Sequence, residues 1–102
     1  MAIAEVTIIP IGTKTTSLSK YVADLYRVLE QQEGIHFQMT PMSTIIEGPL
    51  DRLLELIRIL HETPFGHGAQ RVSTSVKIDD RRDRPASMEQ KMLSVQNKVR
   101  ES

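Results

Sequence analysis

Apolar and polar residues alternate most regularly between positions 71 and 82. Successive side chains of an extended backbone point to opposite faces, so this segment predicts a β-strand with one polar face. Similar alternation predicts a first strand over residues 2–9, which Pro10 and Gly12 end, and a pair of strands around Pro41. The polar side of the last strand comprises Ser73, Ser75 and Lys77.

Helical spacing of apolar residues predicts a helix after the first strand. Ser17 is a plausible cap at its beginning, and Gly34 marks its end. A second function for Ser17, as a ligand contact, stays open. The apolar residues of this helix are Leu18, Tyr21, Val22, Leu25, Val28 and Leu29.

A second helix follows Pro49 and is expected to end before Pro64, because proline disfavours helical geometry in the preceding residue. Leu56 and Ile59 lie off its main apolar stripe. A helix that is apolar around so much of its circumference usually has a second neighbour, here the C-terminal helix or another subunit. The main stripe comprises Leu50, Leu53, Leu54, Ile57 and Leu60.

A third helix is predicted from Ser87, which forms a capping box with Gln90, to residue 99. A charged linker over residues 79–86 precedes it. Such a run usually makes a solvated, ion-paired exit from a strand, although Arg81 and Arg82 can also brace a subunit contact. The third helix has a narrow apolar seam of Met88, Met92, Val95 and Val99.

The predicted order of elements is β-α-β-β-α-β-α within one domain of 102 residues, with a core over about residues 2–80. Two β-α-β halves in sequence predict an α+β, ferredoxin-like sandwich: a four-stranded antiparallel sheet with two helices on one face, plus a C-terminal helix. The other sheet face stays open. It is predicted to carry Glu5, Thr7, Gln38, Thr40, Ser73, Ser75 and Lys77, interrupted by Ile3 and Ile9.

Composition narrows the possible partners of this face. The formal net charge is zero and only two Tyr and two Phe are present, which disfavours nucleic acid. The chain has no cysteine, as suits a cytoplasmic protein, and we expect neither a signal peptide nor a membrane span. His36, His61 and His67 lack the spacing of metal ligands. We therefore expect a second subunit to cover the open face, with a small-molecule pocket between the two faces.

Three motifs make the sequence similar to a known family. They are TTSLSKY at 15–21, TPMSTIIEG at 40–48 and KIDDRRD at 77–83, which follow the opening VTIIPIG at 6–12. Over residues 2–99 the chain resembles the small thiamine-binding proteins of ferredoxin-like fold. Ser43 departs from the family, whose turn is similar to P-M-G-T. The resemblance implies a non-catalytic binder of thiamine or its hydroxymethylpyrimidine half, without other cofactors, built as homodimers or homotetramers.

An aminopyrimidine needs hydrogen-bond donors and acceptors beside an apolar wall. Hydroxyls can donate, Glu5 or Glu47 can accept from the amino group, and Met42 and Ile9 can form the wall. Thr40 and Met42 also suffice as an ordinary turn between two strands. The predicted ligand site comprises Glu5, Thr7, Ile9, Ser17, Ser19, Thr40, Met42, Thr44, Glu47 and Ser75.

Two other functions remain open at the level of sequence. A small ferredoxin-like isomerase or hydrolase would need a base and an anion cradle; Glu5 or His36 can serve as the base, and Lys77 or Arg71 as the cradle. No spacing in the chain joins these residues into a recognisable catalytic set. The other alternative is a structural or regulatory oligomer whose polar sheet face is only an interface.

Overall fold

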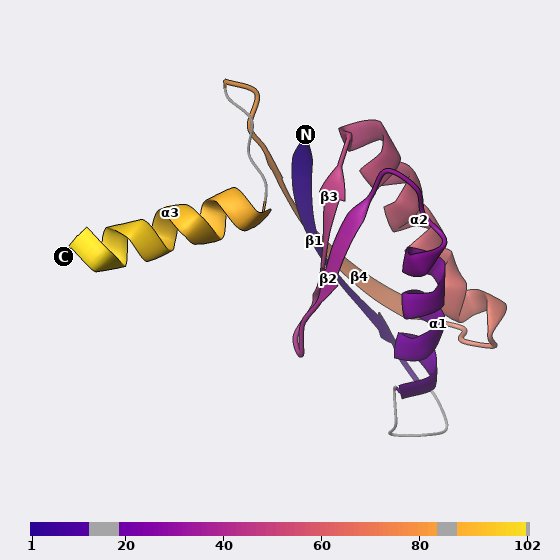
Figure 1. Ribbon diagram of the computed structural model, residues 1–102. Coiled ribbons are helices and arrows are strands. Elements are labelled where there is room, and N and C mark those ends of the chain that lie inside the picture. Colours follow the sequence, from indigo (N-terminus) through magenta and orange to yellow (C-terminus); the bar gives the residue numbers. More distant parts are fainter. Residues whose placement is uncertain (13–18, 84–87, 102) are drawn as a thin grey trace.

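The computed structural model describes residues 1–12, 19–83 and 88–101. Its elements follow the predicted order, so the β-α-β-β-α-β-α prediction is confirmed (Figure 1). The predicted caps Ser17 and Ser87 lie outside the described residues. The elements are β1 (Ala2–Pro10), α1 (Ser19–Glu30), β2 (His36–Met39), β3 (Thr44–Gly48), α2 (Leu50–Gly66), β4 (Val72–Asp80) and α3 (Met88–Glu101).

The four strands form one antiparallel sheet in the order β2-β3-β1-β4, so the N-terminal strand takes a central position. Ala4 of β1 lies opposite Ile46 of β3 on one side and Ile78 of β4 on the other. Helices α1 and α2 cover one face, and the second face carries neither of them (Figure 1). This is the predicted ferredoxin-like arrangement.

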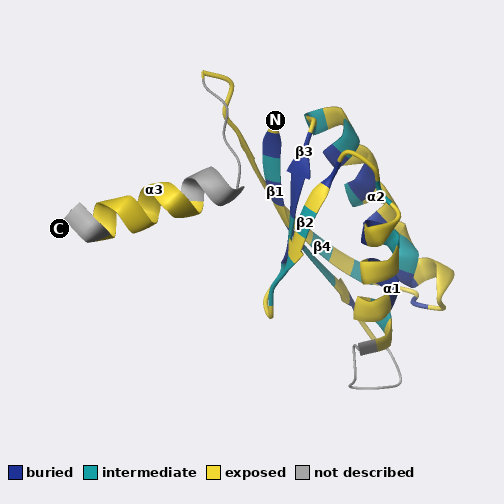
Figure 2. Ribbon diagram, in the orientation of Figure 1, coloured by how far each residue is buried: buried dark blue, intermediate teal, exposed yellow. Residues whose placement is uncertain are grey.

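The core lies between this sheet and the two helices (Figure 2). On β1 the side chains that face the helices are small, which lets the helices approach the centre of the sheet closely. Each fully buried aliphatic side chain stabilises the fold by about 1.5–3 kcal/mol relative to an exposed one. The buried cluster comprises Ala2, Ala4, Val6, Leu25, Leu29, Ile35, Ile46, Leu53, Leu56 and Leu60.

Helix α1 presents a narrower apolar face than the sequence predicts. Leu25 and Leu29 are buried in the core and Val28 packs partly against it, whereas Val22 is exposed. Asp24 takes a buried position beside Leu25. The buried face of α1 is therefore centred on residues 25 and 29, and Val22 does not take part in the contact with the sheet.

Helix α2 corrects two predictions. Its buried stripe is Leu53, Leu56, Leu60 and Pro64, and Leu54, which we expected inside, is 49% exposed whereas Leu56 is 1% exposed. The helix also continues through Pro64 to Gly66, because a proline in the last turn forfeits only one intrahelical hydrogen bond and its ring is fully buried here. The carbonyl of Pro64 then accepts hydrogen bonds from the backbone N–H groups of the following loop.

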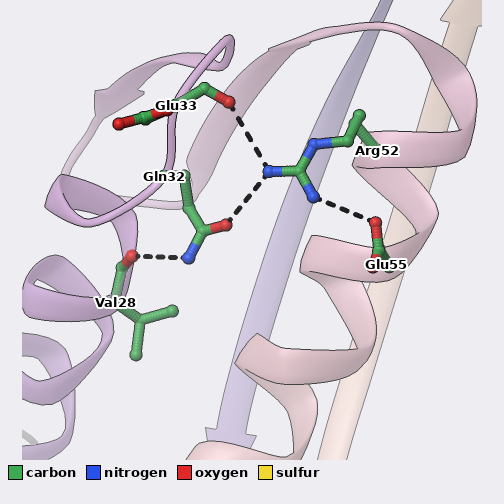
Figure 3. A network of polar contacts seen from close by, with 5 residues as sticks. All are labelled: Val28, Gln32, Glu33, Arg52 and Glu55. Carbon is green, nitrogen blue, oxygen red and sulfur yellow. Dashed lines mark hydrogen bonds and ion pairs between the residues drawn. The ribbon is translucent and has the colours of Figure 1, made fainter.

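An arginine links the end of α1 to the beginning of α2 (Figure 3). The Arg52 guanidinium donates to the side-chain oxygen of Gln32 at 3.4 Å and to the backbone carbonyl of Glu33 at 3.5 Å, and it pairs with Glu55 at 2.9 Å. The Gln32 amide in turn donates to the carbonyl of Val28. Cations near a helix C-terminus are favourable, so Arg52 stabilises the end of α1.

Helix α3 points away from the sheet, on the side opposite α1 and α2 (Figure 1). The radius of gyration is 15.5 Å, larger than the value of about 13 Å for a compact domain of about 100 residues. α3 is therefore not the second neighbour that we expected for α2 within one chain. The apolar side chains that the structure describes on α3 are exposed: Met92, Leu93, Val95 and Val99.

Candidate functional site

The candidate site is the sheet face that α1 and α2 leave uncovered. Residues directly opposite each other on neighbouring strands share a face. One row across the sheet therefore consists of His36, Glu47, Ile3 and Asp79, and the next of Gln38, Ile45, Glu5 and Lys77. Thr7 lies opposite Ser75, and Ile9 opposite Ser73. Five predicted ligand residues thus share one surface: Glu5, Thr7, Ile9, Glu47 and Ser75.

Burial is uneven across this face (Figure 2). Glu47, on the inner strand β3, is only 6% exposed, and the neighbouring Ile3 and Ile45 are half-buried. Toward β4, Glu5 and Ser75 are exposed and Thr7 is half-buried. The most sheltered part of the face therefore combines one carboxylate with two isoleucine side chains.

Thr44 lies on the other side of the sheet. It is opposite Val6 of β1 and Met39 of β2, which both point to the helices, and it is buried. A strand places residues of equal parity on one face, so Thr44 shares the core side with Ile46. The structure therefore separates Thr44 from the other predicted ligand residues.

Thr40 closes the turn between β2 and β3. Its hydroxyl donates to the carbonyl of Ser43 at 2.8 Å and accepts from the backbone N–H groups of Met42 and Ser43 at 3.2 and 2.9 Å. These contacts occupy the hydroxyl within the turn, the structural alternative of the sequence analysis. No described residue other than glycine has a positive φ, so Ser43 replaces the glycine of the family pattern without backbone strain.

The remaining predicted residues do not join the sheltered area. Met42 is 84% exposed in the same turn, so it forms no wall for a ligand within one chain. Ser17 and the side chain of Ser19 lie outside the described part of the protein. The sequence analysis missed Ile45, because two consecutive isoleucines in TIIEG hide the alternation that assigns each to a face.

The charged run after β4 forms ion pairs. Arg81 pairs with Asp83 at 2.7 Å and Arg82 with Asp80 at 2.8 Å, and all four residues are exposed. Hydrogen bonding from the Arg82 guanidinium, with its positive charge, holds the pKa of Asp80 below its ordinary value. This agrees with the prediction of a solvated, ion-paired exit from the last strand.

Neither a metal cluster nor a membrane span is found in the described residues. No group of three or more His, Asp and Glu side chains there is arranged to hold a metal ion. None of the helices in the same residues combines the length and apolar character that a membrane span needs.

Known proteins resemble this chain over nearly its whole length. The family described as thiamine-binding protein matches residues 4–96. UPF0045 protein YqgV of Bacillus subtilis (strain 168) is 55% identical over 98 residues, covering 93% of this chain and 94% of the relative. A UPF0045 protein of Staphylococcus xylosus is 44% identical over 99 residues, covering 94% and 92% of the two chains.

A solved structure agrees with these sequence matches. The crystal structure of a hypothetical protein from Methanocaldococcus jannaschii has a TM-score of 0.83 and 35% sequence identity to this chain, and the match covers 92% of this chain and 94% of that one. Fold and sequence therefore point to one family. The chain belongs to the thiamine-binding protein family.

Proposed function

We propose that this protein binds thiamine, or its hydroxymethylpyrimidine moiety, on the open sheet face without catalysing a reaction. Membership of the thiamine-binding family is the observation that carries the proposal. The face supports it, because a sheltered carboxylate beside two isoleucines suits a ring that is apolar on its faces and polar at its edge.

The chemistry of the ring assigns roles to the residues of the face. The pyrimidine amino group donates to the Glu47 carboxylate, which is buried at the inner strand. The ring nitrogens accept from hydroxyls. Thr7 and Ser75 lie two rows along the sheet from Glu47, so in this proposal they reach the ring from the facing copy of the chain. Ile3 and Ile45 contact the face of the ring. Glu5 lies one row away from Glu47, and in this proposal its carboxylate attracts the cationic thiazolium ring of thiamine.

A second copy of the chain completes the pocket in this proposal. Within one chain Glu5, Ser75 and Ile9 are exposed, so a ligand held only by them would remain largely in water. Covering the face with the corresponding face of another subunit, in a homodimer or homotetramer, excludes that water and strengthens each polar contact. Such a protein would act as a carrier, buffer or sensor of its ligand.

Isothermal titration calorimetry with thiamine and with hydroxymethylpyrimidine tests this function. We expect wild-type protein to bind at least one of them, and Glu47→Gln to weaken binding about tenfold or more, since a hydrogen bond to a charged group contributes about 1.5–3 kcal/mol. Thr7→Val should also weaken binding. Thr44→Val is the matched control, because Thr44 lies on the helix side of the same sheet.

The calorimetry also distinguishes the alternatives. If neither compound gives heat at millimolar concentration, the proposed function is wrong. If both bind but Glu47→Gln and Thr7→Val leave the affinity unchanged, the ligand lies elsewhere on the molecule.

A further inference from the structure

We propose that the ligand of the open sheet face is a phosphate ester of thiamine, and that Lys77 binds its phosphate group. The inference rests on the proposed function, from which it takes the ring positions at Glu47 and Glu5. It adds the charged form of the ligand and a further residue that determines specificity. In the sequence, Lys77 was a candidate anion cradle, because a lysine ammonium can bind phosphate oxygens.

Three charged side chains follow one another across the open face, on three neighbouring strands. Glu47 lies on β3, Glu5 on the central strand β1 and Lys77 on β4. The register of the sheet places all three on the same side of it. Glu5 is directly opposite Lys77 and one row along the sheet from Glu47. A ligand that crosses these strands therefore meets two carboxylates and then an ammonium group.

Glu5 and Lys77 do not neutralise each other. Opposite charges on directly facing residues of neighbouring strands attract, so an ion pair would be the ordinary arrangement. Both side chains are instead exposed, and within the described residues no ion pair or hydrogen bond involves either of them. Each of the two side chains therefore keeps its charge for a ligand that carries the opposite charge.

The spacing of these residues matches the length of the ligand. Neighbouring strands are about 4.8 Å apart, and successive residues on one face are about 6.8 Å apart along a strand. Glu47 and Lys77 are two strands and one row apart, so about 12 Å separates their Cα atoms. In extended thiamine, two rings and a hydroxyethyl chain separate the amino group from the hydroxyl, which is a comparable length. A phosphate on that hydroxyl comes within reach of the Lys77 ammonium.

Two other charged residues near Lys77 do not take its place. Arg71 precedes β4 and is six residues from Lys77, so about 20 Å of extended chain separates them. Asp79 is two residues from Lys77 on the same face and is exposed, and its negative charge opposes a phosphate. Lys77 is therefore the cation that a phosphate beside Glu5 would meet, and Asp79 limits the strength of that contact.

The order of charges distinguishes the phosphate ester from free thiamine. Free thiamine carries one positive charge, on the thiazolium ring, so Glu5 attracts it and Lys77 repels it. The monophosphate adds a negative charge at the far end of the molecule, where Lys77 becomes an attractive partner. A second copy that covers the face would exclude water from this contact and strengthen it. Lys77 therefore favours the phosphate ester over the free compound.

Isothermal titration calorimetry with thiamine and with thiamine monophosphate tests the inference. We expect the wild type to bind the monophosphate about tenfold more tightly, as a charge-assisted hydrogen bond allows. Lys77→Gln should remove this preference without weakening the binding of thiamine. Asp79→Asn should increase the preference, because it removes a negative charge beside the phosphate. Lys20→Gln is the matched control, since it removes the same exposed charge from α1, which covers the other face of the sheet (Figure 1).

A shorter ligand tests the spacing. Hydroxymethylpyrimidine phosphate carries its phosphate next to the pyrimidine ring, so a molecule held at Glu47 cannot reach Lys77 with it. We expect this phosphate to bind no more tightly than hydroxymethylpyrimidine, and Lys77→Gln to leave its affinity unchanged. Raising the salt concentration should reduce the preference for thiamine monophosphate over thiamine, because salt screens the contact between phosphate and ammonium.

The same titrations separate this inference from the proposed function. If thiamine binds and its monophosphate binds no better, or if Lys77→Gln keeps the preference, the inference is wrong and the proposed function stands. If neither compound binds, the proposed function fails and the inference fails with it. Lys77 is an exposed residue of a regular strand, so we expect Lys77→Gln to fold, and an unchanged circular dichroism spectrum checks this.

Discussion

The imidazole Nε2 of His67 lies 3.5 Å from Oδ2 of Asp24, a buried carboxylate oxygen with no hydrogen-bond partner among the described residues. The other oxygen, Oδ1, accepts from Arg27 at 2.9 Å. Burying a carboxylate is costly unless both oxygens are compensated. His67 follows α2 directly, so this contact joins the loop after α2 to α1.

A double-mutant cycle on this pair should give a coupling free energy of about 0.5–1 kcal/mol, measured by urea denaturation. His67→Ala should destabilise the wild type, and the same substitution should have a smaller effect once Asp24→Ala has removed the carboxylate. Arg27→Ala should also destabilise the protein, because it leaves Oδ1 of the buried Asp24 carboxylate without its hydrogen bond. Additive effects of the two substitutions would show that His67 does not compensate Asp24.

Adjacent leucines of α2 should differ strongly in their contribution to stability. Leu53→Ala should lower the free energy of unfolding by about 2–5 kcal/mol, because Leu53 is fully buried in the core. Leu54→Ala should cost much less, since Leu54 is half exposed. Chemical denaturation of both variants measures the difference, and equal losses would contradict the phase that we describe for α2.

Two glycines should respond to alanine with opposite signs. A Cβ on Gly48 would lie 2.7 Å from Cδ1 of Ile35 and 3.3 Å from the carbonyl of Gly34, so Gly48→Ala should destabilise the protein by about 1–3 kcal/mol. Gly66, in the last turn of α2, has open space around it. Gly66→Ala should stabilise by about 0.4–1 kcal/mol. Thermal unfolding checks both signs, and a destabilised Gly66→Ala would count against the helical assignment there.

Acid should weaken the Asp80–Arg82 pair. Because the pKa of Asp80 is lowered in the folded protein, the pair stabilises the fold above the ordinary carboxyl value of 3.8, and this contribution is lost as the pH falls through the lower folded value. Arg82→Ala should raise the pKa of Asp80 toward its ordinary value, as followed by NMR titration of the carboxyl carbon. Arg81→Ala, which removes only the pair with Asp83, should leave the titration of Asp80 unchanged.

Much of the fold follows from periodicity in the sequence. Alternation at β1 and β4 correctly assigned Thr7 and Ser75 to one face, because the period of a strand is fixed by backbone geometry. The order of elements was confirmed for the same reason. These properties depend on neighbours along the chain, which the sequence displays directly.

Other features depend on contacts between distant segments, and periodicity did not reveal them. The sequence analysis placed Leu54 on the main apolar stripe of α2 and Leu56 off it, and the structure shows the reverse. A helix that is apolar around much of its circumference does not indicate which side meets the sheet. The contact of Asp24 with His67 joins α1 to the loop after α2, two segments that are far apart in the sequence. The prediction that α2 ends before Pro64 was wrong, because a proline in the last turn removes only one intrahelical hydrogen bond and the helix can continue past it.

The central position of β1 has a consequence for how the protein folds during its synthesis on the ribosome. β1 is synthesised first, yet its neighbour β4 is the last strand to emerge from the exit tunnel. Closing such a distant pair is slow, because the chain must lose the entropy of the whole intervening loop first. A nascent chain cut short before residue 72 therefore holds β1 with one side bare, and such fragments should depend on chaperones to stay out of aggregates.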